Sequence, residues 1–341
     1  MTTPPPQNSG PPPAETAARA AEALFGQRVE RITGPGGARR ASVRVHFDDH
    51  SVIASWRADP DRRAREIALL THLTQAGANV PRPLGLQDGW SFQTDAGSRR
   101  LTSALLRREG AARDDLAAAA CESLLRIKSA TRGGGFLAGL PVIANGADWL
   151  TRFADGPRHL GRLLHRSAPD YDAQALAGGM TSLPLSFIKW DARPGNAALS
   201  DDGRVIWFDW EDYGRRAGVE DAAFLVADEF WPISAARSLE ILDATGFVTG
   251  RRLPLFLRFA VLHAVHRCRL IVAQRDRHGW ADPDHARRYD RIGTDPDLLA
   301  TCAANGAVLA TRDALTEPLA RWLDEIAHAA RAEARARAMP D

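Results

Sequence analysis

The sequence predicts an α+β protein of two lobes, in which a small antiparallel sheet is followed by a mainly helical lobe. Three observations lead to this expectation. Apolar and polar residues alternate between Ser42 and Phe47, as they do in half-buried strands. Long stretches typical of helices begin near Asp114. Among the expected helices, residues 186–212 form a short β-rich region. A chain of 341 residues is long enough for one large two-lobed domain.

We expect three segments along the chain. Residues 1–13 are rich in proline and polar residues, which predicts a disordered tail. Residues 14–107 should form the first lobe, and residues 108–341 the helical second lobe.

The first lobe should begin with a helix over Ala14–Phe25, which is rich in Ala, Glu and Leu and is closed by Gly26. Strands are expected over Val29–Ile32, Ser42–Phe47 and Ser51–Trp56. The first two are separated by a glycine-rich turn, and the last two by an Asp-Asp-His turn. This succession predicts a glycine-turned hairpin followed by another antiparallel strand.

A second helix should begin at Asp59-Pro60, because Asp is a frequent N-cap and Pro fits the first helical position. We expect it to run to about Gly77. Glu66 shares a helix face with leucines three, four and seven residues later. If that face is buried, the carboxylate requires a partner. The alternative is that Glu66 is a surface residue whose carboxylate reaches water.

Two strands should complete the first lobe, an edge strand over Val80–Leu84 and a last strand over Leu101–Leu106 that leads into the second lobe. The second lobe should consist of long helices. They are expected over Leu116–Lys128, Trp149–Leu164, Asp221–Asp228, Leu253–Arg275 and Glu317–Arg337.

The composition excludes several classes of protein. Hydrophobic residues make up 45%, charged residues 25%, and the formal net charge is only +2, as in a soluble globular protein. Acidic residues balance the basic ones, which argues against a nucleic-acid partner. The sequence contains no run of about 18 apolar residues, so no membrane span is expected. The three cysteines are far apart and show no paired spacing, and the N-terminus lacks a signal-peptide pattern, which favours a cytoplasmic protein. The oligomeric state is not predicted.

The pattern that carries chemistry is an Asp and an Asn on a tight loop, followed by a second Asp. Asp191 and Asn196 are five residues apart across a Pro-Gly turn, and Asp209 ends a strand thirteen residues after Asn196. Phosphoryl transfer needs such a set, one carboxylate to orient a hydroxyl and an amide with a second carboxylate to hold Mg²⁺. Taken alone, the Asp-to-Asn spacing is also typical of turns and helix caps.

These residues resemble a known family. The run Trp190–Asn196, followed by Val205–Trp210, is similar to a loop close to His-Gly-Asp-x-x-x-x-Asn and a strand ending in Ile-Asp-Trp, which are typical of aminoglycoside phosphotransferases and choline kinases. The resemblance implies a protein-kinase-like fold and the use of ATP and Mg²⁺. It implies that Asp191 is the catalytic base, that Asn196 and Asp209 are the metal ligands, and that Asp221 braces the catalytic loop.

The first lobe carries a weaker resemblance. Gly36-Gly37 before Ser42–Val45 look like the glycine loop and second strand that cover the nucleotide, although the glycines also fit an ordinary hairpin turn. Ser51–Trp56 looks like the third strand. The helix that carries Glu66 looks like the one that supplies the ion-pair glutamate. The whole match spans roughly residues 28–330.

The sequence departs from the family pattern at the nucleotide lysine. Ser55 occupies the third-strand position where that lysine is expected, and the only lysines of the chain are Lys128 and Lys189. Arg57 follows Ser55 by two residues and therefore points to the same face of the sheet, and Arg44 lies on the adjacent strand. Either arginine is a candidate for the missing positive charge, with a different reach and geometry.

Two further departures lie in the catalytic loop. Lys189-Trp190 replaces His-Gly, and we interpret Lys189 as a structural residue. Arg193 replaces the family's usual His two residues after the Asp, and it is a candidate to stabilise charge on the transferred phosphate or, alternatively, a loop-bracing residue. His263 and His266 lie on a helix that either lines the acceptor pocket or packs in the core.

The sequence therefore predicts an ATP-dependent kinase that phosphorylates a hydroxyl of a small molecule. A polycationic aminoglycoside is not expected as acceptor, because residues 251–341 hold 15 Arg against 12 Asp plus Glu. Two alternatives stay open. The first is a pseudokinase that binds nucleotide or a partner without phosphoryl transfer, which Ser55 and the altered loop would fit. The second is an enzyme that transfers AMP instead of phosphate with the same residues.

Overall fold

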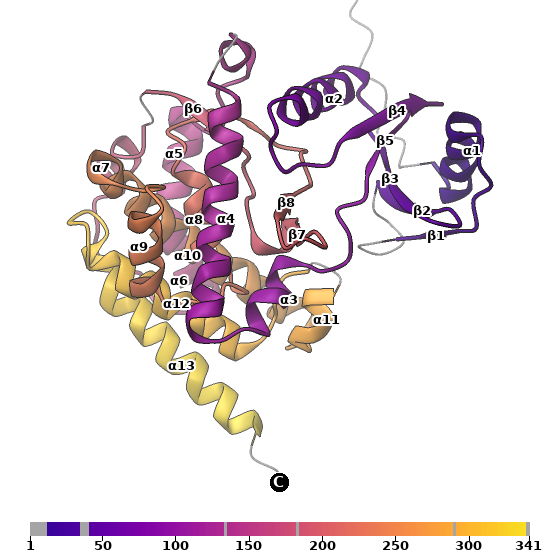
Figure 1. Cartoon of the computed structure of the whole chain (residues 1–341). Helices are drawn as coiled ribbons and strands as arrows, with labels where there is room; N and C mark the ends of the chain where they lie inside the picture. Colours follow the sequence, from indigo (N-terminus) through magenta and orange to yellow (C-terminus); the bar gives the residue numbers. More distant parts are fainter. Residues whose placement is uncertain (1–11, 35–40, 133–134, 182–183, 289–290, 339–341) are drawn as a thin grey trace, which may run out of the picture.

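The computed structural model describes residues 12–34, 41–132, 135–181, 184–288 and 291–338. It has the predicted α+β architecture of two lobes. Figure 1 shows the small antiparallel sheet and its two flanking helices on the right, and the larger helical lobe on the left.

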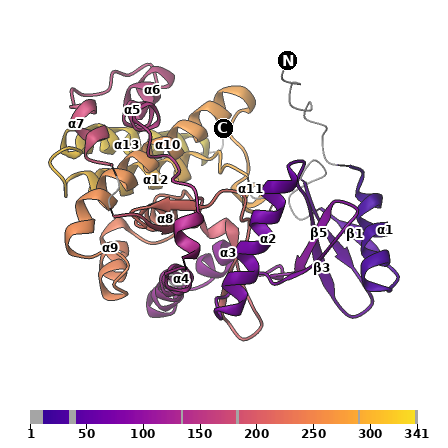
Figure 2. The ribbon, with the colours of Figure 1, turned by 90° about the horizontal axis from the view of Figure 1, so that it is seen from above.

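The N-terminal sheet contains five antiparallel strands in the order β1-β2-β3-β5-β4. The strands are β1 Arg31–Thr33, β2 Ser42–His46, β3 Ser51–Trp56, β4 Pro83–Gln87 and β5 Trp90–Thr94. In the turned view of Figure 2, α1 (Ala14–Phe25) and α2 (Pro60–Gln75) lie on opposite sides of the sheet. The side chains on the α1 side, among them Val45, Val52 and Phe92, are buried in a small core of their own. The opposite face is left to line a pocket between the lobes.

The helix starts agree with the sequence. Asp59 caps α2, since its side chain accepts from the backbone N–H groups of Asp61 and Arg62, and Pro60 is the first helical residue. Glu66 is buried on the same helix as Leu69. The prediction that its face points inward is confirmed.

The first lobe differs from its prediction in three places. Leu101–Leu106 is helix α3 and not a strand. A short apolar run does not distinguish a strand from a buried helix by its period, and Leu and Ala are good helix formers. Strand β5 was not predicted, although Asp88-Gly89 before it is a strong hairpin signal, and both residues have positive φ as such a turn requires. The edge strand β4 begins at Pro83 and not at Val80.

The helical lobe is built around α10 (Leu253–His278), of which thirteen residues are buried. The predicted helix over Trp149–Leu164 is two helices, because Gly156-Pro157 start a new one. The other helices of this lobe are α4 Gly110–Ala130, α5 Ala147–Ala154, α6 Gly156–Leu163, α7 Ala173–Gly178, α8 Glu220–Val226, α9 Ala235–Ala244, α11 Pro283–Arg288, α12 Pro296–Ala310 and α13 Ala320–Ala338. Of these, α7, α9, α11 and α12 were not predicted.

The helical lobe also contains two small two-stranded sheets. Strand β6 (Ser186–Ile188) pairs with β9 (Gly214–Arg216), and β7 (Ala197–Leu199) pairs with β8 (Val205–Trp207), both antiparallel. The loop between β6 and β7 and the loop after β8 are therefore held side by side. The polar residues of the sequence motif lie on these two loops.

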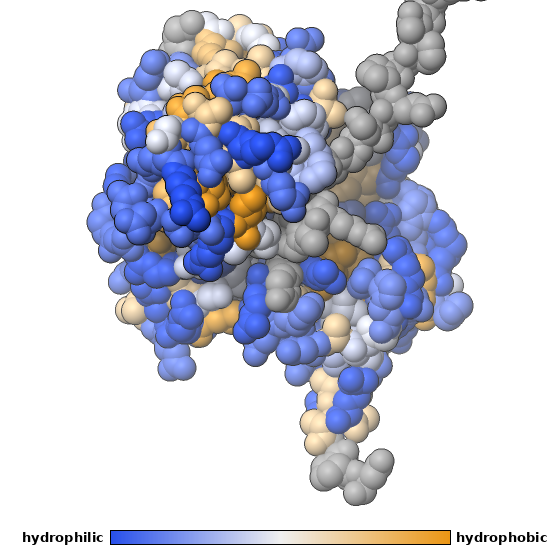
Figure 3. Space-filling model, turned by 90° about the vertical axis from the view of Figure 1, so that its right-hand side faces the viewer, coloured by the Kyte–Doolittle hydropathy of each residue, from blue (hydrophilic) through white to orange (hydrophobic). Residues whose placement is uncertain are grey.

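One face of the molecule is seen in a space-filling view. The face seen in Figure 3 is largely hydrophilic, with hydrophobic residues in small separate areas. Within the described ranges, no helix combines the length and the apolar character that a membrane crossing demands.

Candidate active site

The loop after β6 is fixed by a buried carboxylate. Asp221, near the start of α8, accepts hydrogen bonds from the backbone N–H groups of Lys189 at 3.0 Å and Trp190 at 2.9 Å. The ammonium of Lys128 lies 3.1 Å from Asp221 and balances its charge. Asp221 thus occupies the bracing position that the resemblance implied.

Lys189 connects the two loops. Its side chain is fully buried, and its ammonium donates to the backbone oxygen of Asp209 at 3.0 Å. Burial lowers the pKa of Lys189, although the carboxylates of Asp209, Asp191 and Asp221 oppose this shift. These contacts agree with the interpretation of Lys189 as a structural residue. They hold the backbone of Asp209 against the loop that carries Asp191.

The backbone is strained at this point. Trp190, Asp191 and Asp209 have φ angles of 60°, 45° and 61°, in the left-handed region that residues other than Gly seldom adopt. Each such residue costs on the order of 1–3 kcal/mol and persists only where its surroundings enforce it. The hydrogen bonds to Asp221 and from Lys189 provide that enforcement.

Asp191 is held as a carboxylate. Arg193 Nε donates to its Oδ1 at 3.0 Å, and Asn196 Nδ2 donates to its Oδ2 at 2.8 Å. Burial opposes ionisation, but Arg193 and Lys189 outweigh it and hold the pKa of Asp191 below its usual value. The side chain remains 44% exposed, so a ligand can reach it.

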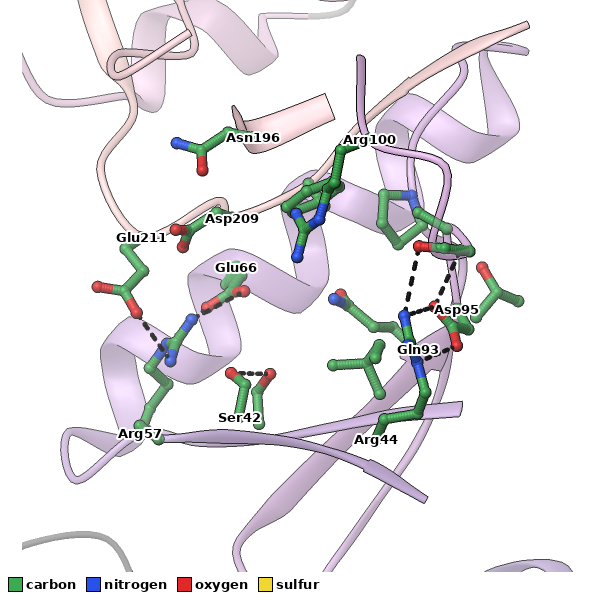
Figure 4. A pocket seen from close by; sticks show the side chains of 18 residues that line it. Ser42, Arg44, Arg57, Glu66, Gln93, Asp95, Arg100, Asn196, Asp209 and Glu211 are labelled. Carbon is green, nitrogen blue, oxygen red and sulfur yellow. Dashed lines mark hydrogen bonds and ion pairs between the residues drawn. The ribbon is translucent and has the colours of Figure 1, made fainter. Parts of the chain in front are cut away.

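Asn196 and Asp209 lie on adjacent backbone segments, because the N–H of Phe208 donates to the carbonyl oxygen of Asn196 at 3.0 Å. Figure 4 shows the amide oxygen of Asn196 turned toward the carboxylate of Asp209. Burial raises the pKa of Asp209, and the neighbouring Glu211 and Asp191 add to this effect, which Lys189 only partly offsets.

These two residues fit a magnesium ion. Mg²⁺ prefers oxygen ligands and is commonly held by one or two carboxylates together with substrate phosphates. In the part of the chain that the structure describes, no hydrogen bond or ion pair reaches the Asp209 carboxylate. A cation would stabilise this buried, poorly compensated charge.

The inter-lobe pocket, between the sheet and these loops, receives Asn196 and Asp209 from one side and the sheet from the other (Figure 4). Its other lining residues are Ala41, Ser42, Arg44, Ile53, Ser55, Arg57, Glu66, Pro81, Gln93, Thr94, Asp95, Ala96, Gly97, Arg100, Phe208 and Glu211. Every first-lobe candidate from the sequence that the structure describes lines this pocket. Gly36 and Gly37 lie outside the described residues.

The partner of Glu66 is Arg57. Arg57 Nε lies 3.0 Å from Glu66 Oε2, both side chains are only 9% exposed, and a second nitrogen of Arg57 lies 3.1 Å from Glu211. Burial lowers the pKa of Arg57, but these carboxylates reverse the shift and raise it. Ser55 makes a short contact with Ser42, with 2.9 Å between their hydroxyl oxygens. Glu66 is therefore paired with the arginine that directly follows β3, the strand that carries Ser55.

Arg44 has its own carboxylate. Its guanidinium donates to Asp95 Oδ1 at 3.0 Å, while Ser51 donates to the other oxygen of Asp95 at 2.6 Å. Asp95, Glu211 and Arg100 were not identified from the sequence. Glu211 follows Asp209 by two residues, so its position was a usable signal, whereas Asp95 and Arg100 follow the unpredicted strand β5.

A buried charge network lies behind Arg193. Arg267 on α10 makes two hydrogen bonds of 2.6 Å to Glu229. Asp228 lies 3.6 Å from Arg193 and 3.9 Å from Arg267, and its Oδ2 accepts no hydrogen bond within the described residues. Burial and the charge of Glu229 raise the pKa of Asp228 to about 7. The network ties the loop that carries Asp191 and Arg193 to the segment after α8 and to α10.

This shift makes the stability depend on pH. The folded-state pKa of Asp228 lies above its unfolded value near 4, so the contribution favours folding at low pH and is lost as the pH rises from about 4 to 7. Asp228→Asn mimics the protonated side chain and does not titrate. Its unfolding free energy relative to that of the wild type should therefore be higher at pH 8 than at pH 5 by roughly 1–3 kcal/mol. Urea unfolding at both pH values measures it, with the exposed Asp243→Asn as control. An unchanged difference would mean that Asp228 is ionised throughout.

A second pocket, here the aromatic pocket, is lined by Asp191 and has a volume of about 510 Å³. It is lined by Trp149, Arg152, Phe153, Gly156, His159, Trp190, Asp191, Asp212, Phe224, Phe259, Leu262, His263, His266 and Arg269. His263 and His266 therefore line the pocket as well as packing against their neighbours. Trp207 and Trp210 are buried in the core, whereas Trp190 faces the pocket.

Comparison with known proteins agrees with this geometry. Residues 27–256 match the model of the phosphotransferase enzyme family. No curated protein sequence matches the chain significantly. A choline/ethanolamine kinase family protein from Mesorhizobium loti has 15% identity over 92% of this chain and 98% of its own, with a TM-score of 0.57.

Two other solved structures share the fold. Spectinomycin phosphotransferase APH(9)-Ia, in complex with ADP and spectinomycin, has 8% identity over 88% of this chain and 99% of its own, with a TM-score of 0.54. An aminoglycoside phosphotransferase from Alicyclobacillus acidocaldarius has 13% identity over 91% and 96%, with a TM-score of 0.50. At these identities the structures show the fold alone. The family model, which covers more than half of the chain, shows that this protein belongs to the phosphotransferase enzyme family.

Proposed function

We propose that this protein transfers the γ-phosphate of ATP, in the presence of Mg²⁺, to a hydroxyl group of a small molecule. One observation carries the proposal. Asp191 lines the aromatic pocket while Asn196 and Asp209 line the inter-lobe pocket, and Lys189 holds their loops together. Residues 14–107 would cover the nucleotide, and residues 108–341 would hold the catalytic loop and the acceptor.

Each polar residue has a role in this reaction. Asp191 accepts the proton of the acceptor hydroxyl while the hydroxyl oxygen forms a bond to the γ-phosphorus of ATP. The bond between that phosphorus and the bridging oxygen of the β-phosphate breaks, and ADP leaves. Asn196 and Asp209 would hold Mg²⁺, which offsets the charge of the phosphates. Arg193, 3.0 Å from Asp191, would stabilise negative charge on the transferred group.

Arg57 is our candidate for the charge that the family lysine supplies. It is the guanidinium paired with Glu66, and it lies in the inter-lobe pocket together with Asp209. Glu211, which is 47% exposed, is the partner that phosphate oxygens would replace. Arg44 pairs with Asp95, and we propose that it lies beside the bound nucleotide.

The reaction is tested with ATP labelled at either phosphate and a panel of hydroxyl metabolites. Transfer of the γ-label supports the proposed reaction, and transfer of the α-label would indicate AMP transfer. Ser55 in place of the lysine favours the rival, a pseudokinase that binds nucleotide or a partner without transfer. Nucleotide binding with neither label transferred to any hydroxyl compound would support that rival.

The metal site has a test of its own. ATP with Mg²⁺ at about 100 times its dissociation constant should stabilise the wild type by about 2.7 kcal/mol. Asp209→Asn removes the carboxylate ligand, so the additional stabilisation that Mg²⁺ gives over ATP alone should disappear. Thermal unfolding with ATP, with and without Mg²⁺, measures both, and Asp201→Asn on the exposed turn after β7 is the control. A full Mg²⁺ effect in Asp209→Asn would place the metal elsewhere.

A further inference from the structure

The aromatic pocket contains two arginines for which the described residues supply no carboxylate. Arg152 on α5 is exposed, and no hydrogen bond or ion pair within the described ranges engages its side chain. Arg269 on α10 contacts two imidazoles, His266 Nδ1 at 3.0 Å and His159 Nδ1 at 3.4 Å. Arginine can only donate, so both ring nitrogens accept. The imidazoles orient the guanidinium and leave its charge uncompensated.

The histidine partners supply no negative charge. Burial, with the charges of Arg269 and Arg267, lowers the pKa of His266 to about 4 and keeps it neutral at pH 7. His159 faces Asp155 through its other ring nitrogen, Nε2, at 3.3 Å. A chain from Asp155 through His159 therefore orients the Arg269 guanidinium. Guanidinium groups form strong charge-assisted hydrogen bonds with carboxylates and phosphates.

The acidic residues of the pocket are already engaged. Among the described lining residues, the carboxylates are Asp191 and Asp212. Asp191 accepts from Arg193 and Asn196, and Asp212 lies 3.1 Å from Arg62. Both carboxylates thus already have a positively charged partner, whereas the described residues give Arg152 and Arg269 none of opposite charge. This difference favours a negatively charged ligand.

The aromatic wall does not form a cage for a cation. The Arg216 guanidinium lies 5.6 Å from the ring centroid of Trp149 and 5.5 Å from that of Phe259. These rings already interact with a buried positive charge. Trp149, Phe153 and Trp190 are only partly buried and offer flat apolar surface to a ligand.

We propose that the acceptor is an anionic hydroxyl compound with a flat apolar body. Its carboxylate or phosphate would pair with Arg152 and Arg269, its body would lie on Trp149 and Trp190, and its hydroxyl would face Asp191. The hydroxyl assignment rests on the proposed phosphotransferase function. The preference for an anion rests on the arginines and is measurable without any phosphoryl transfer.

The test uses four probes that share a 4-(hydroxymethyl)phenyl body and differ in the group opposite the hydroxymethyl: 4-(hydroxymethyl)benzoate, 4-(hydroxymethyl)phenylphosphonate, the neutral 4-(hydroxymethyl)benzamide and the cationic 4-(hydroxymethyl)benzylamine. Binding is followed by calorimetric titration and by tryptophan fluorescence, with ADP and Mg²⁺ present. We expect at least one anionic probe to bind at least tenfold more tightly than the amide, and the amine to bind most weakly. Comparison of the carboxylate with the phosphonate shows which anion the arginines prefer.

Arg269→Gln and Arg152→Gln should each remove most of the anion preference and leave the stabilisation by ATP and Mg²⁺ intact. Arg152 is exposed, so its variant should fold even if Arg269→Gln does not, and Arg269→Lys should retain part of the preference. Arg321→Gln, on the exposed face of α13, is the matched control. Tightest binding of the amine, no binding of either anion at millimolar concentration, or an anion preference unchanged in Arg152→Gln and in the folded Arg269 variant would each overturn the proposal.

The two proposals fail in different ways. Selective anion binding without label transfer to either anionic probe or to any compound of the panel would sink the phosphotransferase function and keep the anion site. Label transfer to the amide or the amine at rates equal to those of the anionic probes would sink the anion site and keep the phosphotransferase.

Discussion

Asp191→Asn is expected to lower kcat for phosphoryl transfer about 10³-fold, within the range that a positioned general base contributes. An amide keeps the size of the side chain and still accepts from Arg193, but it cannot take the proton of the acceptor hydroxyl. The measurement is the rate of γ-label transfer at saturating ATP and acceptor.

Binding should separate this loss from misfolding. Asp191 lines the aromatic pocket and not the inter-lobe pocket, so Asp191→Asn should retain the stabilisation by ATP and Mg²⁺. The exposed variant Asp201→Asn should transfer phosphate at the wild-type rate. If Asp191→Asn also reaches that rate, another group takes the proton and the mechanism is wrong.

Arg267→Leu is expected to cost about 3–5 kcal/mol of unfolding free energy, the range for breaking a buried ion pair from one side. Glu229 would keep one hydrogen bond, from the backbone N–H of Gly293 at 3.0 Å, and lose both bonds to the guanidinium. Asp228 would lose a neighbouring positive charge at the same time. Urea unfolding at pH 7 measures the change.

A double-mutant cycle assigns the cost to the pair. Glu229→Gln in the Arg267→Leu background should recover part of the loss, because an amide is less costly to bury than a carboxylate. Arg321→Leu, which breaks an exposed ion pair with Glu325, should change stability by less than about 1 kcal/mol. If Arg267→Leu falls in that small range too, Glu229 is compensated from elsewhere.

Much of the fold could be predicted because its signals are local. Asp59-Pro60 defines the start of α2 by capping alone, and the inward face of Glu66 follows from its spacing to the leucines. Arg57 and Ser55 alternate along the chain and both line the inter-lobe pocket. That this arginine reaches the pocket could therefore be predicted from the sequence.

The rest depends on contacts between distant segments. Leu101–Leu106 reads equally well as strand or helix, and packing selects the helix. The partners of Arg193 include Asp228, which is thirty-five residues away, and the periodicity of the sequence does not predict this contact. The uncompensated charge of Arg269 likewise appears only when α5, α6 and α10 are placed around one pocket.

Both lysines of the chain make structural contacts in the interior: Lys128 forms an ion pair with Asp221, and Lys189 donates a hydrogen bond to the backbone oxygen of Asp209. Both are almost completely enclosed. Acylating and alkylating reagents that need a free side-chain amine therefore have no access to them while the described fold is intact. Modification of either lysine would therefore report that the structure around it has unfolded locally.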